Sequence, residues 1–213
     1  FVFLKEVQTQ RPNMFKKTTL LLFTIGILCG TLNAQNSQAL TGYIVTKNNY
    51  HLTGAIGLIE HTKYGSMVEF INDFGTTYFL HPALIKGFVF FEGPAISAYE
   101  SKYYRNTWMF LRLQYSGENI SLLQTPETLV KYEWFNGNLV AHDKKIVQYW
   151  VELPGDRILP LKKLGFRRQM KRLMSDTAPR LSRLIGKKGY RFKDLYTILE
   201  AYDKECAKGK RRL

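Results

Sequence analysis

The chain has 213 residues, a formal net charge of +14 and only two cysteines, Cys29 and Cys206. Its length allows one well-formed core, or one domain with an appended subdomain. Cys29 lies in a segment that we expect to be removed. A disulfide within the remaining chain is therefore excluded, and packing must stabilise its core.

Residues 14–34 have the parts of a cleavable signal peptide. Met14 is followed by two lysines, then by the apolar run 20–28, then by small residues that end at Ala34. A membrane anchor is the alternative, but a spanning helix needs about 20 apolar residues, and this run is shorter. The mature chain then begins near Gln35, and residues 1–13 are an upstream extension without structure. We predict a protein with no transmembrane span that is periplasmic, outer-envelope-associated or extracellular.

The excess positive charge lies in the last third of the chain. Residues 35–150 hold 9 Lys and Arg and 9 Asp and Glu, so they are neutral. Residues 151–213 hold 18 Lys and Arg against 7 Asp and Glu, an excess of 11. This asymmetry indicates either contact with an anionic partner or a solvated face that only aids solubility.

The first two thirds of the mature chain read as short strands. Residues 42–46 and 51–59 flank an Asn-containing turn, and residues 67–71 and 76–80 flank a second turn, which is typical of two hairpins. Further strands are expected at 87–91, 107–115, 120–123, 130–135 and 146–153. Short strands separated by regular turn signals suggest a sandwich or an open barrel.

After residue 155 the apolar period changes from that of strands to that of helices. Apolar residues fall at helical spacing in three stretches, 166–174, 181–185 and 195–206. Asp176 is the expected N-cap of the second helix, and Gly186 or Gly189 its stop. The sequence thus predicts an α+β protein. An antiparallel β domain at 36–155 is followed by a three-helix basic subdomain at 156–213.

No motif identifies a catalytic, cofactor-binding or metal site. The four histidines lack metal-ligand spacing, and neither a nucleophile elbow nor a phosphate-binding loop is present. A site assembled from distant residues would not show in the sequence. The sequence leaves open whether the protein is an enzyme, and the missing motifs favour a non-enzymatic role without a cofactor.

The segment from Gly186 to Gly189 matches the GxxG loop of KH domains. In that fold the loop lies between two helices and clamps a nucleic-acid backbone. A Gly-Lys-Lys-Gly helix stop is also ordinary capping chemistry, and an exported protein meets little RNA. Nucleic-acid binding is therefore an alternative that the sequence disfavours, alongside an enzyme with an unreadable site.

Several segments resemble a group of uncharacterised exported proteins of Bacteroidetes. The resemblance rests on the signal that ends at Ala34, on residues 42–45 and 52–56, on 78–90, on 117–122 and on the helical end 190–202. It implies export and a β-then-helix layout, and it implies no activity and no site residues.

The favoured function is a non-enzymatic binding module that docks on an anionic envelope surface or a partner protein. The candidate anion-binding residues are Arg167, Arg168, Lys171, Arg172, Lys187, Lys188, Arg191 and Lys193. Four of them lie in the helix predicted at 166–174, and the other four lie between the helices predicted at 181–185 and 195–206. Together they carry much of the charge of the last third.

Overall fold

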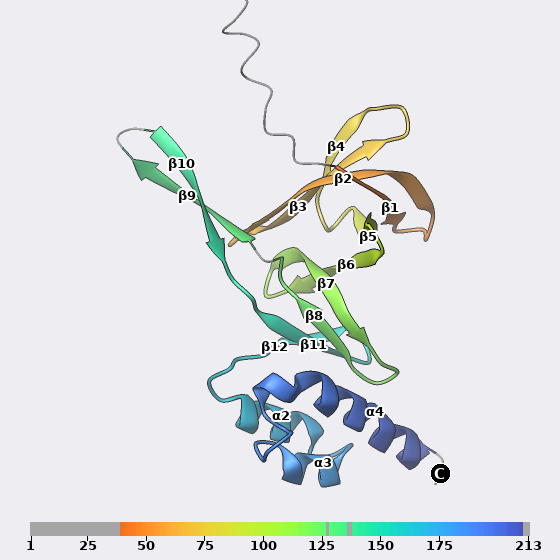
Figure 1. Ribbon diagram of the computed structural model, residues 1–213, viewed down its shortest axis with the longest axis vertical. Coiled ribbons are helices and arrows are strands. Elements are labelled where there is room, and N and C mark those ends of the chain that lie inside the picture. Colours follow the sequence, from red (N-terminus) through yellow and green to blue (C-terminus); the bar gives the residue numbers. More distant parts are fainter. Residues whose placement is uncertain (1–38, 127, 136–137, 211–213) are drawn as a thin grey trace, which may run out of the picture. The chain divides into compact units, whose positions relative to one another are not determined.

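The computed structural model describes residues 39–126, 128–135 and 138–210, which belong to one compact unit (Figure 1). The predicted upstream extension and signal peptide lie outside the described residues. The strands are β1 (Leu40–Thr46), β2 (His51–Thr62), β3 (Gly65–Asn72), β4 (Thr77–Leu80), β5 (Ile85–Glu92), β6 (Ala95–Tyr104), β7 (Thr107–Ser116), β8 (Ser121–Gln124), β9 (Thr128–Phe135), β10 (Asn138–Lys145), β11 (Tyr149–Leu153) and β12 (Arg157–Pro160). The helices are α2 (Phe166–Met174), α3 (Pro179–Leu184), the short 3-10 helix η1 (Phe192–Asp194) and α4 (Leu195–Lys210).

Ten of these strands form one antiparallel sheet, in the order β12-β11-β8-β7-β6-β5-β1-β2-β3-β4. The remaining two, β9 and β10, pair with each other as a separate hairpin between β8 and β11 in the chain. The helices follow the last strand. The α+β class and the order of an antiparallel β region followed by helices are confirmed.

Both predicted hairpins are present, and local turn chemistry forms each of them. Between β1 and β2, Asn49 takes a positive φ of 65°, and its N–H donates to the carbonyl of Thr46. Between β3 and β4, the side-chain oxygen of Asn72 accepts from the N–H groups of Phe74 and Thr76 at 3.0 and 2.8 Å. Asn and Gly in such turns tolerate the backbone angles that β-branched residues resist.

The first five strands curl, because a short link joins two strands that are far apart in the sheet. Residues 81–84 connect β4 to β5, yet β3, β2 and β1 lie between those strands. A flat sheet would separate β4 from β5 by about 19 Å, four strand spacings. The five residue steps from Leu80 to Ile85 reach at most about 18 Å fully extended. The link also contains a turn, in which the Leu84 N–H donates to the carbonyl of His81. The sheet must therefore bend to bring β4 toward β5.

The curl encloses one apolar cluster, which we call the curl core. Its buried members are Ile44, Ile56, Val68, Phe70, Ile85, Phe88, Phe90, Tyr99 and Phe110. Their aromatic rings pack in stacked and edge-on pairs, with the Phe88 centroid 4.8 Å from that of Tyr99 and 4.9 Å from that of Phe110. These contacts join β5, β6 and β7 from the inside.

A second cluster, the helix core, lies between the helices and the far end of the sheet (Figure 1). The sheet contributes Leu122, Val151 and Leu153, the β7–β8 turn contributes Ile120, and the helices contribute Phe166, Met170, Met174, Leu181, Leu195, Ile198, Leu199 and Tyr202. Short amphipathic helices are marginal alone and gain stability by burying their apolar stripe. On the opposite face of the same strands, Met109, Leu111, Leu123, Trp150 and Ile158 form a third, smaller core.

The prediction that Asp176 caps α3 is wrong. The N-cap position is Ala178, and no side chain caps the helix locally. Instead, the carboxylate of Glu205 in α4 accepts the N–H groups of Arg180 and Leu181, both at 3.1 Å. A residue 24 positions away in the chain therefore satisfies the first donors of this short helix, a contact that the local sequence cannot predict.

Three strands were not predicted, namely β6, β10 and β12. Strand β12 lies beyond residue 155, where the predicted boundary falls, and it pairs with β11 at the edge of the sheet. Within the described residues, no helix is long and apolar enough to cross a membrane.

Candidate functional site

The eight predicted cations lie on exposed positions of the helical region. Seven are exposed, and Lys171 is half-buried. In α2, Phe166, Met170 and Met174 face the helix core. Each helical residue advances by about 100°, so these three side chains fall within about 80° of one another, and the basic residues of the same helix lie outside that arc. The helix therefore buries one face and presents its charge on the other.

None of the eight cations has a carboxylate partner within the described parts of the chain. The only ion pairs there are those of Lys102 with Glu100 and with Glu152. Asp194, Asp203 and Glu205 of the helical region bind backbone or polar groups instead. Asp194 accepts the Arg191 N–H at 3.0 Å, and Asp203 accepts from the turn between β7 and β8. These carboxylates are thus engaged in hydrogen bonds within the protein, and the eight cations have no carboxylate partner among the described residues.

The loop from Gly186 to Gly189 is a compact turn that ends α3. Ile185 is already non-helical, and both glycines have positive φ, +93° and +81°. The Lys187 N–H donates to the carbonyl of Leu184 at 2.9 Å. Glycine adopts this conformation without strain, so helix termination accounts for both glycines.

One contact brings the loop to helix α2. A Cβ added to Gly186 would lie 2.8 Å from Cδ of Arg167, so the arginine stem runs directly across this glycine. The structure therefore joins the predicted cations of α2 to those of the loop, although 19 residues separate Arg167 from Gly186. Arg191 and Lys193 follow at the start of η1, where Arg191 is in an extended conformation.

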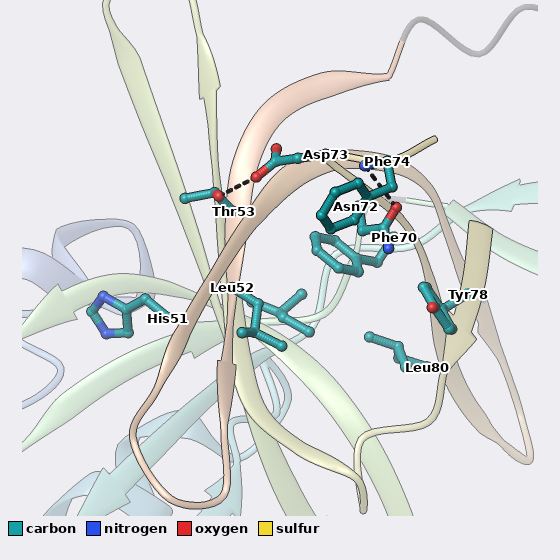
Figure 2. Close-up of a pocket in the computed structure, with 10 residues that line it drawn as sticks. His51, Leu52, Thr53, Phe70, Asn72, Asp73, Phe74, Tyr78 and Leu80 are labelled. Atoms are coloured by element: carbon teal, nitrogen blue, oxygen red, sulfur yellow. Dashed lines mark hydrogen bonds between the residues drawn. The ribbon is translucent and has the colours of Figure 1, made fainter. Parts of the chain in front are cut away.

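A pocket of about 430 Å³ opens at one end of the curl core, and we call it the mouth pocket (Figure 2). Its apolar lining consists of Ile44, Leu52, Phe70, Phe74, Tyr78 and Leu80. The pairing register places Leu52 opposite Ile44 and Tyr78 opposite Phe70, so all four side chains share the core-facing side. Leu52 and Tyr78 nevertheless stay 48% and 46% exposed. The pocket is thus the open end of an apolar core.

The polar groups of the mouth pocket are fixed by contacts with the protein. Asp73 accepts the hydroxyl hydrogen of Thr53 at 2.6 Å, a bond drawn in Figure 2. His51 points away from the hollow, and its ring stacks on Tyr43 at 4.8 Å. This arrangement can hold an apolar group. The two hairpins were predicted, but the register that pairs Leu52 and Tyr78 with core residues was not, so the sequence analysis did not find this pocket.

A half-buried charge cluster joins strands β6 and β11, which are not neighbours in the sheet. Lys102 contacts Glu100 at 2.7 Å and also contacts Glu152. Burial alone would lower the pKa of Lys102, but hydrogen bonds and charge from the two glutamates outweigh it and raise the pKa above its usual value. The lysine is therefore a fixed cation at neutral pH, which suits it to joining strands.

No group of three His, Cys, Asp or Glu residues that could hold a metal ion occurs in the described ranges. Comparison of the chain with protein families, with curated proteins and with solved structures finds no match. The site must therefore be judged on its own geometry.

Proposed function

We propose that this chain is an exported, non-enzymatic binding module that docks on an anionic surface through the eight cations. The observation that carries the proposal is their exposure without carboxylate partners among the described residues. The resemblance to exported Bacteroidetes proteins supports placing that surface in the envelope or outside the cell.

The separation of apolar from basic residues on helix α2 supports this proposal. Helix α2 buries Phe166, Met170 and Met174, so its cations are presented by a helix that packs on the sheet. Surface charges fixed on a folded scaffold sum their attraction to an anionic surface. We propose on this basis that the three helices act as a basic subdomain on an open-barrel-like β domain.

The magnitude of the attraction follows from the number of charges. Near an anionic membrane leaflet, each Lys or Arg contributes about 1 kcal/mol. Neutralising four of the eight cations should then weaken binding to anionic vesicles by up to about three orders of magnitude. Binding should also fall steeply with added salt, because exposed charges are screened within about 8–10 Å at physiological ionic strength.

The test is a binding series with anionic phospholipid vesicles, neutral vesicles and single-stranded RNA at several salt concentrations. One variant carries Gln at positions 167, 168, 171 and 172, and a second carries Gln at positions 187, 188, 191 and 193. A matched control exchanges Lys for Arg and Arg for Lys at the four α2 positions, which keeps the charge. We expect the two Gln variants to lose vesicle binding to a similar degree and the control to keep it.

Two outcomes would contradict the proposal. Binding of RNA in preference to vesicles, lost on Lys187→Asp with Lys188→Asp but not in the α2 variant, would favour the GxxG loop as a nucleic-acid clamp. The absence of salt-sensitive binding to any of the ligands would leave the charge as a solubility feature.

A further inference from the structure

The mouth pocket takes no part in the proposed docking through the eight cations. Figure 2 shows the strands curling around a hollow, into which Leu52 and Leu80 project from opposite sides and Phe70 from between them. Ile44 and Phe70 are 4% and 3% exposed and belong to the curl core. Because these side chains are tightly packed from behind, the inner wall of the pocket is formed without a ligand.

The fold leaves apolar surface of this pocket in contact with water. Leu52 and Tyr78 face the core side of their strands and yet stay about half exposed. Phe74, at the rim, is 93% exposed. Removing apolar surface from water is favourable, so an apolar molecule that fills the hollow gains from the burial of its own surface and from that of the pocket.

The volume of the mouth pocket, about 430 Å³, sets the size of its ligand. A cavity of about 150 Å³ lined by Leu, Ile and Phe holds one benzene ring. The mouth pocket is nearly three times as large, which suits a molecule of two or three rings. It also falls within the range of about 300–1,000 Å³ that is typical of small-molecule sites.

The polar residues of the lining favour an uncharged ligand. No Lys or Arg of the described residues lines the pocket, so an anionic group placed in the hollow would have no cation to pair with. Asp73 is a carboxylate of the lining, and it accepts the hydroxyl hydrogen of Thr53 at 2.6 Å. His51 points away from the hollow. Burying a charge between apolar walls without a partner is costly, so these walls select against charged ligands.

We propose that the mouth pocket binds a small, uncharged apolar molecule of two or three rings. The rings lie between Leu52 and Leu80 and against the side chain of Phe70, and aromatic contacts with Phe70 and Tyr78 add to the gain from burial. This site shares no residue with the eight cations, so it stands or falls independently of docking on an anionic surface.

The first test titrates the unmodified chain with two fluorescent probes that share the same three rings. N-phenylnaphthylamine is uncharged, and anilinonaphthalenesulfonate adds one sulfonate. Both brighten in apolar surroundings. The titrations are run at high salt, which screens attraction of the sulfonate to the basic helices. We expect the uncharged probe to saturate one site per chain and the sulfonate to bind about tenfold more weakly or less. Equal affinities would overturn the assigned ligand class.

Two leucines of β2 provide a matched pair of variants. Leu52 and Leu58 are 48% and 54% exposed, but only Leu52 lines the pocket. Leu52→Gln should weaken binding of the uncharged probe about fivefold or more, because about half of a leucine side chain no longer gains from burial. Leu58→Gln should leave the affinity unchanged. Equal affinities of Leu52→Gln and the parent would refute the site.

A third variant guards against effects of misfolding. Phe74 is almost fully exposed, so Phe74→Ser leaves the core intact, and we expect it to weaken binding roughly two- to threefold through the loss of one wall of the rim. The variant with four Gln residues in α2 should bind the uncharged probe as the parent does.

A second copy of the chain is the alternative occupant of the mouth pocket, and sedimentation separates the two cases. A monomer at the concentrations of the titration supports the small-molecule site. A dimer that Leu52→Gln dissociates and the uncharged probe displaces would assign the pocket to a second copy and overturn the proposal.

Discussion

Asp203 is predicted to hold the helices to the sheet, and its removal tests that role directly. Its carboxylate accepts three hydrogen bonds from the β7–β8 region: from the hydroxyl of Tyr115 at 2.7 Å, and from the backbone and side-chain nitrogens of Asn119 at 2.8 and 3.2 Å. A Cβ on Gly117 would lie 1.7 Å from one of its oxygens, so this turn approaches the carboxylate as closely as glycine allows. The contact joins α4 to the strands that carry the helix core.

The expected cost follows from the number and kind of these bonds. A hydrogen bond to a charged group contributes about 1.5–3 kcal/mol, and removing one partner leaves the others to find water. The three bonds share one acceptor and are half-exposed, so their values do not add. We expect Asp203→Ala to lower the free energy of unfolding by about 2–4 kcal/mol. Lys204→Ala, an exposed change in the same helix, is the matched control and should stay within about 0.5 kcal/mol.

The assay is urea denaturation of the parent chain, both variants, Tyr115→Phe and the double variant. The double-mutant cycle should give a coupling energy between Asp203 and Tyr115 of about 0.5–3 kcal/mol. A cost below about 0.5 kcal/mol for Asp203→Ala, equal to that of the control, would refute the tether. Helix docking would then depend on apolar packing alone.

Two further predictions concern pH and the loop. Burial, with the hydrogen bond and charge of Asp203 and the charge of a nearby glutamate, raises the pKa of Tyr115 from 10.0 to about 12. The stabilisation from this group is therefore complete below pH 10 and is lost as pH rises from 10 to about 12, whereas Tyr115→Phe lacks this loss. Asp203→Asn should lower that pKa, and absorbance of tyrosinate checks it; an unchanged titration would contradict the assignment. In the loop, Gly186→Ala and Gly189→Ala both meet positive φ and should each cost about 1–3 kcal/mol in urea denaturation. Only Gly186→Ala also pushes against the α2 arginine, so a smaller cost there than at Gly189 would contradict that contact.

The sequence predicts the two N-terminal hairpins well because their causes are local. In the second hairpin, Asn72 and Gly75 lie between two apolar runs, and the structure uses both residues for the turn. The helical stripes are also local, and helix positions agree with the apolar period for the same reason. The curl cannot be predicted from local sequence. It follows from the short link 81–84 together with the order of the strands, and that order includes the long-range pairing of β1 with β5.

Strand β6 was not predicted because its first residues depart from the usual alternation of buried apolar and exposed polar positions. Ser97 is 1% exposed and points inward, whereas its neighbour Ile96 is 66% exposed. At this end of the strand the apolar and polar positions of the usual alternation are thus exchanged, although Tyr99 further along is buried in the curl core. Strand β12 was not predicted for another reason. It contains Pro160, and proline argues against a strand, but at the edge of the sheet it is tolerated.

The placement of charge on α2 can be predicted from its apolar stripe, because the unburied side of a short helix is fixed once the buried side is known. The contact between Arg167 and Gly186 cannot, since it depends on how α2 and α3 cross over the helix core. The prediction of the N-cap of α3 is wrong for the same reason, because the contact depends on how helices pack. Asp176 was predicted from the local sequence, but the acceptor comes from Glu205 in a different helix.

The surroundings of Trp150, a pocket of about 200 Å³, lie at the limit of sequence reasoning, because their parts come from segments that share no local pattern. His61, Thr125 and Trp150 stand 64 and 25 residues apart in the chain, and no local motif marks any of them. Burying a polar group costs stability unless a partner satisfies it, so local rules place such residues outside. Where a fold breaks that rule, the exception marks either strain or a site. The indole of Trp150 is such an exception, since it is buried and its N–H has no acceptor among the described residues.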